Sequence, residues 1–96
     1  MDSTAAREFA LTVQLGGWGI DEDVASCVLA ELAHLRATPS PAPVDTVAFD
    51  CVVTAGCDLE AVAYASTRAI AVLLAHGVAS PHVLSVEVGS FDRALV

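Results

Sequence analysis

The chain has 96 residues and a formal net charge of −8, with 12 carboxylates against four arginines. This length suits one domain, and an electrostatic field of this sign repels a phosphate backbone, which excludes nucleic-acid binding through the general surface. The longest uninterrupted apolar run of the best membrane-span candidate, residues 69–75, is far below the ~20 residues that a span needs, so we expect no membrane partner.

Residues 1–7 are short and polar, and we expect them to form a tail ahead of an ordered core of about residues 8–89. This start lacks the basic-then-apolar pattern of a signal peptide, which predicts a cytoplasmic protein. Residues 90–96 are expected to form a second tail, so that a single domain extends over 1–96.

Residues 8–15 alternate between apolar and polar side chains, which is typical of a strand with one buried face. The expected inward-facing residues are Phe9, Leu11, Val13 and Leu15. We expect a glycine-rich turn to end the strand, because glycine tolerates backbone angles that other residues resist. That turn is Gly16, Gly17, Trp18 and Gly19.

A first helix is expected to begin at Asp21, whose side chain suits the N-cap, and to end near Arg36. Its apolar side chains recur at steps of three and four, which predicts one buried stripe. Pro39, Pro41 and Pro43 follow in an extended connector that cannot serve as a central strand.

Alternation returns over residues 44–54 and again over residues 83–89. The expected inward-facing residues of these two strands are Val47, Phe49, Cys51 and Val53, then Leu84, Val86 and Val88, with Val83, Ser85 and Glu87 facing outward. Between them, Asp58 is expected to cap a helix over residues 59–76, which Gly77 ends.

The outer face of every strand is partly polar, whereas parallel strands covered on both faces are apolar throughout. The pattern therefore predicts an α+β fold: a ferredoxin-like βαββαβ plait with two helices on one face of a mixed sheet of three to four strands. The proline-rich connector takes the place of the second strand at the sheet edge, either as an extended segment or as a very short strand.

In its order of elements the chain resembles small ferredoxin-like domains of actinobacteria that stand alone or accompany a helix-turn-helix segment. The resemblance covers about residues 9–88, with the glycine-ended first strand, the acidic helix start and the Asp58-Leu59-Glu60 helix entry. It implies the plait fold and carries no site residues.

The sequence contains no recognisable catalytic, cofactor or metal motif, and we expect none of these groups. Two of the three cysteines, Cys27 and Cys51, fit small core positions, and Cys57 falls in a turn. The glycine-rich turn lacks the full spacing of a phosphate-binding loop. Together with Tyr64 it stays a candidate ligand loop, formed by Gly16, Gly17, Trp18, Gly19 and Tyr64.

The uncovered sheet face is the stronger candidate site, because small and apolar residues lie among its polar ones. Its candidate interaction residues are Thr12, Gln14, Ala48, Asp50, Val52, Ser85 and Glu87. We therefore expect a non-catalytic interaction or accessory module that binds itself, as a homodimer through the sheet face or an edge, or another protein. The alternatives are a small-ligand sensing domain and an enzyme of unrecognised type using Cys57, His76 or His82.

Overall fold

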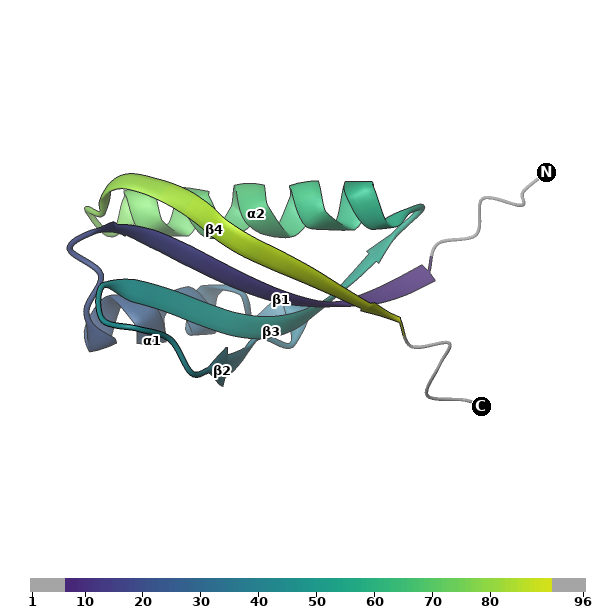
Figure 1. Ribbon diagram of the computed structural model, residues 1–96, viewed down its shortest axis with the longest axis horizontal. Helices are drawn as coiled ribbons and strands as arrows, with labels where there is room; N and C mark the ends of the chain where they lie inside the picture. Colours follow the sequence, from purple (N-terminus) through teal and green to yellow (C-terminus); the bar gives the residue numbers. More distant parts are fainter. Residues whose placement is uncertain (1–6, 91–96) are drawn as a thin grey trace.

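The computed structural model describes residues 7–90, so most of both expected tails, residues 1–6 and 91–96, lies outside the described part. In chain order the elements are β1 (Arg7–Trp18), α1 (Glu22–Glu31), a 3₁₀ turn (Ala33–Leu35), β2 (Thr38–Ser40), β3 (Thr46–Ala55), α2 (Asp58–Ala75) and β4 (Ala79–Ser90) (Figure 1). This is the predicted βαββαβ succession.

The strands form one sheet in the order β2-β3-β1-β4, and every neighbouring pair is antiparallel. The expected mixed sheet is therefore wrong. β1 and β2 run parallel to each other with β3 between them, and β3 and β4 run parallel with β1 between them. Each strand-helix-strand unit is thus split by an inserted strand, which is the arrangement of the ferredoxin-like plait, and the predicted fold class is confirmed.

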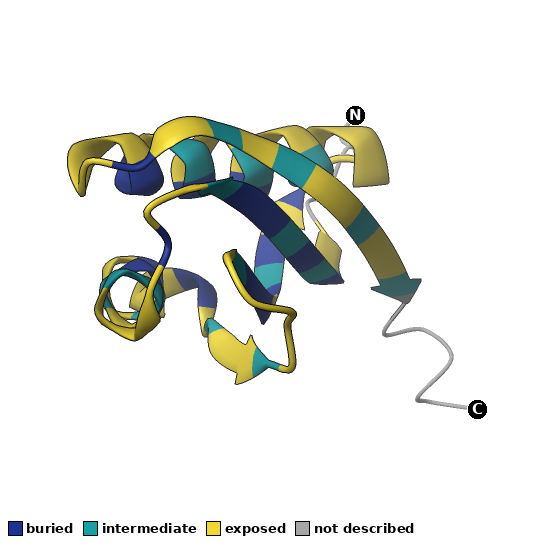
Figure 2. Ribbon diagram, turned by 60° about the vertical axis from the view of Figure 1, so that its left-hand side comes forward, coloured by how far each residue is buried: buried dark blue, intermediate teal, exposed yellow. Residues whose placement is uncertain are grey.

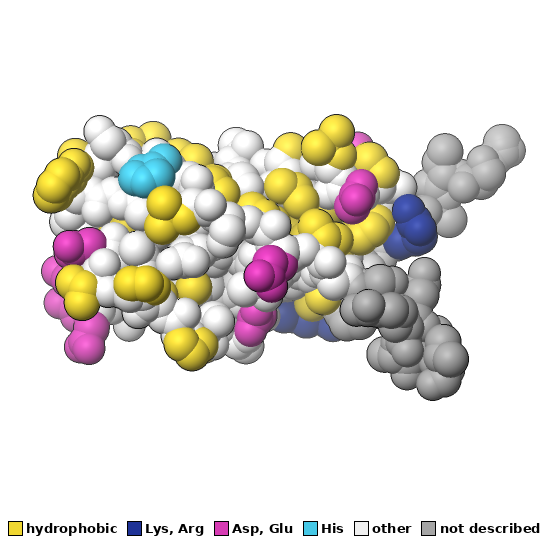
Figure 3. Space-filling model, in the orientation of Figure 1, with side chains coloured by type: hydrophobic (Ala, Val, Ile, Leu, Met, Phe, Trp, Pro, Cys, Tyr) yellow, Lys and Arg dark blue, Asp and Glu magenta, His cyan; other side chains and the backbone are white. Residues whose placement is uncertain are grey.

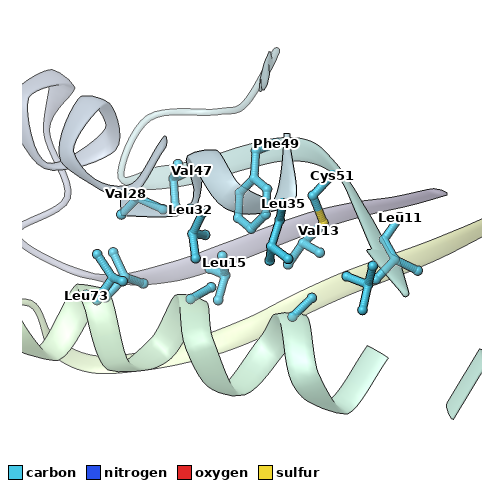
Figure 4. Packing of buried hydrophobic residues seen from close by; sticks show 14 of the residues in the cluster. Leu11, Val13, Leu15, Val28, Leu32, Leu35, Val47, Phe49, Cys51 and Leu73 are labelled. Atoms are coloured by element: carbon cyan, nitrogen blue, oxygen red, sulfur yellow. The ribbon is translucent and has the colours of Figure 1, made fainter. Parts of the chain in front are cut away.

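Both helices lie behind the sheet in the view of Figure 1, so they cover the same face. The inward-facing side chains of β1 and β3 meet the helices there, and Figure 4 shows them pointing toward one another. Fully buried members include Leu11 and Leu15 on β1, Phe49 on β3 and Leu32 after α1. Most side chains of α2 that face this core are small, because they are alanines, namely Ala61, Ala65 and Ala69.

The proline-rich connector contributes the predicted short edge strand. Thr38, Pro39 and Ser40 pair with β3 opposite Asp50, Phe49 and Ala48. Proline is tolerated at an edge because its missing N–H removes no ladder bond on the solvent side. The strand expected to begin at residue 44 begins instead at Thr46, and Val44 is an exposed loop residue.

A β-bulge on β4 corrects the expected facing of two residues. Ser85 pairs with Gln14 and Val83 pairs with Leu15, which leaves Leu84 as the extra residue. A bulge inserts one residue, so the alternation reverses beyond it. Val83 therefore packs against the core, and Leu84 is exposed, the reverse of the prediction. Val86 keeps its predicted facing.

Asp21 caps α1 as predicted, since its Oδ1 accepts a hydrogen bond of 2.9 Å from the N–H of Val24. The regular helix is shorter than expected and ends at Glu31. The 3₁₀ turn continues the chain to Arg36, which has a left-handed backbone with φ of 57°.

The caps of α2 differ from the prediction at one end. The N-cap is Cys57, and Asp58 is already helical. At the other end the N–H of Val78 donates to the carbonyl of Leu73, and the N–H of Gly77 donates to that of Leu74. This pair of bonds is a Schellman motif, in which Gly77 takes the left-handed backbone with φ of 84°.

The first two glycines of the expected turn belong to β1. Gly16 pairs with His82 and Trp18 with Ala79, so the chain turns only at Gly19, whose φ is 96°. Gly17 is required by packing, because a Cβ there would lie 2.6 Å from Cγ1 of the buried Val78.

We expect Gly17→Ala to lower the free energy of unfolding by about 1–3 kcal/mol, since the buried Val78 would have to shift and backbone atoms of Ala79 and Pro81 lie 3.3 Å away. Gly89→Ala is the matched control, because its Cβ would meet Ala10 at 3.5 Å or more, an ordinary contact. Its free energy of unfolding should change by less than about 1 kcal/mol. Chemical denaturation measures both, and equal losses would contradict the packing role of Gly17.

Candidate interaction surface

The sheet face that no helix covers carries a row of polar side chains that crosses all four strands. Thr38 on β2 pairs with Asp50 on β3, Asp50 pairs with Thr12 on β1, and Thr12 pairs with Glu87 on β4. The hydroxyl of Thr12 donates a hydrogen bond of 2.6 Å to Oδ1 of Asp50. Residues directly opposite on neighbouring strands share a face. Leu11 and Val13, on either side of Thr12 in β1, are buried against the helices, so this row lies on the opposite, uncovered face.

Smaller side chains flank the polar row on both sides. Gln14 lies between Ala48 and Ser85 on one side, and Ala10 lies between Val52 and Gly89 on the other. The registers thus place all seven expected interaction residues on one face: Thr12, Gln14, Ala48, Asp50, Val52, Ser85 and Glu87. Figure 3 looks onto this face, where apolar groups are interspersed with carboxylates.

A hollow of about 440 Å³ lies on this face beside the polar row. Asp50 and Glu87 line it together with Arg36. Arg36 was not among the predicted surface residues, because the sequence pattern placed it at the end of a helix. The left-handed backbone that places it beside the sheet results from the 3₁₀ turn, which has no sequence pattern of its own.

Three of the glycine-rich turn residues expected to form a ligand loop line a second, smaller pocket of about 300 Å³. Gly16, Gly17 and Trp18 contribute to it, together with His82 and Leu84 from β4. A Cβ on Gly16 would lie 3.1 Å from Nε2 of His82, so the missing side chain makes room for the imidazole. Nδ1 of His82 lies 2.9 Å from the carbonyl oxygen of Ser80, and this contact orients the ring.

The other two candidate ligand residues do not join this pocket. Gly19 lies at the turn beyond it, and Tyr64 is a half-exposed residue of α2. Val78, just after α2, packs against Gly17, so the pocket is near the C-terminal end of that helix. Tyr64 lies 11 residues (75 − 64) before that end, or about 17 Å along the helix axis.

The candidate nucleophile and bases of an enzyme are also separated. Cys57 is the N-cap and His76 the C-cap of the same helix, so about 28 Å divides them. Nε2 of His76 lies 2.5 Å from Oε2 of Glu31, at the end of α1, and this contact joins the ends of the two helices. His82 lies on β4 beside Gly16. No nucleophile-base pair forms among these three residues.

Within residues 7–90 no three His, Cys, Asp or Glu side chains converge on a point where a metal ion could bind. No helix in that part of the chain is long and apolar enough to cross a membrane. No protein-family model, curated protein or solved structure matches the chain. No site residue can therefore be transferred to this surface from a relative, and its chemistry has to be inferred from its geometry.

The cysteines differ in environment. Burial, and secondarily the negative charge of Asp50, raises the pKa of the Cys51 thiol from 9.0 to about 11. Cys57 is exposed. Between pH 9 and 11 an unfolded chain loses the Cys51 proton that the folded chain retains, so stability decreases as the pH rises through this window.

We expect an aromatic disulfide reagent at pH 8 to label Cys57 rapidly and Cys51 only after unfolding, since the thiolate is the reactive form. Peptide mapping by mass spectrometry distinguishes the two sites, and Cys57→Ser removes the fast one. Rapid labelling of Cys51 in the folded Cys57→Ser protein would contradict its protection.

Proposed function

We propose that this protein is a small, non-catalytic interaction module of the cytoplasm that forms a homodimer through its open sheet face or a sheet edge. One observation carries the proposal: two helices cover one face of a four-stranded sheet, and neither covers the other. A half-apolar sheet face left bare on a small domain is a natural binding surface for protein.

The bare face is large enough for an interface. The four strands have 12, 3, 10 and 12 residues. At a spacing of ~4.8 Å and a rise of ~3.3 Å per residue they give a flat area of about 600 Å². Side-chain relief adds to this, and a stable interface takes about 800 Å² of accessible surface from each partner. Another flat surface could approach the sheet closely, because several side chains on this face are small or absent, namely those of Ala48, Ala10 and Gly89.

The geometry supports binding rather than catalysis. A nucleophile needs a base within hydrogen-bond reach, and Cys57 and His76 are at opposite ends of α2. The polar row on the open face, by contrast, satisfies part of its own hydrogen bonding through Thr12 and Asp50. Such a row suits an interface that must stay hydrated when unbound.

We expect size-exclusion chromatography with light scattering to give the mass of a dimer across a tenfold range of concentration. A mass that stays at the 9.8 kDa of one chain throughout would contradict self-association.

A second candidate function is small-ligand sensing at the pocket of Gly16, Trp18 and His82. The oriented ring of His82 and the bare backbone of Gly16 favour it. A volume of about 300 Å³ is at the lower limit for ligand pockets.

We expect a ligand of this pocket, from a panel of nucleotides and metabolites, to change the fluorescence of Trp18, the single tryptophan, and to raise the melting temperature. Gly16→Ala adds a methyl group 3.1 Å from Nε2 of His82 and should weaken binding about tenfold or more. A panel that moves neither signal, or a ligand that Gly16→Ala binds equally well, would remove this candidate.

A further inference from the structure

The outer edge of β4 is the part of the sheet that the fold leaves least protected. β4 pairs with β1 on one side, and it is an end strand of the sheet. We propose that a second copy of this chain pairs with the second half of β4 as an antiparallel strand centred on Val86, which joins two sheets into one. This inference rests on the proposed homodimer and selects which of its two surfaces forms the contact.

The two edges of the sheet are protected to different degrees. At the far edge, β2 has three residues and includes Pro39, and the 3₁₀ turn also contacts β3. Short edge strands and prolines discourage pairing with another chain. On β4, Pro81 lacks an N–H and the bulge at Leu84 interrupts the ladder, so its first half is protected as well. Residues 85–89 contain neither a proline nor a bulge.

Apolar side chains at this edge are exposed where a neighbouring strand would cover them. Val88 pairs with Leu11, which is 1% exposed, yet Val88 itself is 43% exposed. Both face the helix side, so the difference arises because β4 is the end strand of the sheet that residues 7–90 form. In Figure 2 no residue of Ala79–Gly89 is fully buried, in contrast to the central stretch of β1. A paired strand would bury Val86 and Val88 further.

Charge indicates where a second copy can approach. Two copies with a net charge of −8 repel each other, so self-association needs a surface with few carboxylates. The open face has Asp50 and Glu87 near its centre. The start of α1 has Asp21, Glu22 and Asp23. Over residues 79–89, β4 carries a single carboxylate, that of Glu87.

The sequence of β4 is compatible with pairing to itself. A two-fold axis at Val86 places this residue opposite its own copy and Ser85 opposite Glu87 of the second chain, a hydroxyl against a carboxylate. In this register Val88 lies opposite Leu84 of the second chain, at the end of the contact. An axis at Glu87 would instead oppose two carboxylates, which is unfavourable. The charge of Glu87 thus excludes one register and permits the neighbouring one.

Three Val→Glu variants of equal charge test the inference. Val88 is at the β4 edge, Val52 on the open face, and Val44 in a loop away from both. We expect Val88→Glu to raise the dimer dissociation constant at least about 30-fold, as expected for a hot-spot loss. Val44→Glu and Val52→Glu should each change it less than about threefold. Light scattering over a concentration series gives the constants, and thermal melting checks that each variant folds.

Amide hydrogen exchange on the wild-type chain tests the same contact without any substitution. In an antiparallel ladder alternate residues direct their N–H groups toward the neighbouring strand. Among residues 85–89, the amides not directed at β1 should exchange about tenfold more slowly at high than at low protein concentration.

The outcomes separate the two proposals. A wild-type dimer that Val52→Glu dissociates and Val88→Glu does not would overturn the edge contact and leave the homodimer standing on the open face. Amides of residues 85–89 that exchange independently of concentration in a dimer would overturn the edge contact as well. A wild-type monomer at every concentration would overturn both proposals.

Discussion

The handedness of chain crossovers is the constraint on which the arrangement of this molecule depends. A strand-helix-strand connection between parallel strands is nearly always right-handed. β1 crosses to β2 through α1, and β3 crosses back to β4 through α2, over strands that run the opposite way. The second crossover starts from a strand of opposite direction and also crosses the sheet in the opposite direction. With both reversed, a right-handed crossover places its helix on the same face as the first. Both helices must therefore cover one face, and the other face is left bare.

That constraint determines whether each strand residue is buried against the helices or exposed to water. Inward-facing residues of β1 and β3 bury apolar surface against the helices, and the alanine face of α2 lets the helix approach the sheet closely. Outward-facing residues meet water and alternate with them, so the bare face is partly polar by necessity. Because β1 is paired on both sides, its outward residues Thr12 and Gln14 lie at the centre of that face, with β3 and β4 on either side. The hydrogen bond from Thr12 to Asp50 then fixes one side chain of β3 against β1.

Period-2 alternation was sufficient to predict the plait, the facing of β1 and β3 and the placement of the seven face residues. The N-cap at Asp21 and the helix stop at Gly77 followed from local chemistry. The bulge at Leu84 could not be predicted in this way, because it is a property of two strands in register and leaves no mark on the pattern of one strand. Gly16 and Gly17 were misassigned to a turn, although glycine in a strand also marks a close approach, here by His82 and Val78. The antiparallel direction of every neighbouring pair likewise could not be predicted, because it depends on the spatial order of the strands.

The bulge also separates the two candidate surfaces of β4. It turns Leu84 toward the open face, where this residue lines the pocket with Gly16 and Trp18. The same extra residue interrupts the ladder, so the regular free edge begins only at Ser85. A ligand in the pocket would contact residues before the bulge, and a paired strand would contact residues after it. The two surfaces adjoin along β4, and β1 pairs with β4 on both sides of the bulge, so β4 and β1 both connect them.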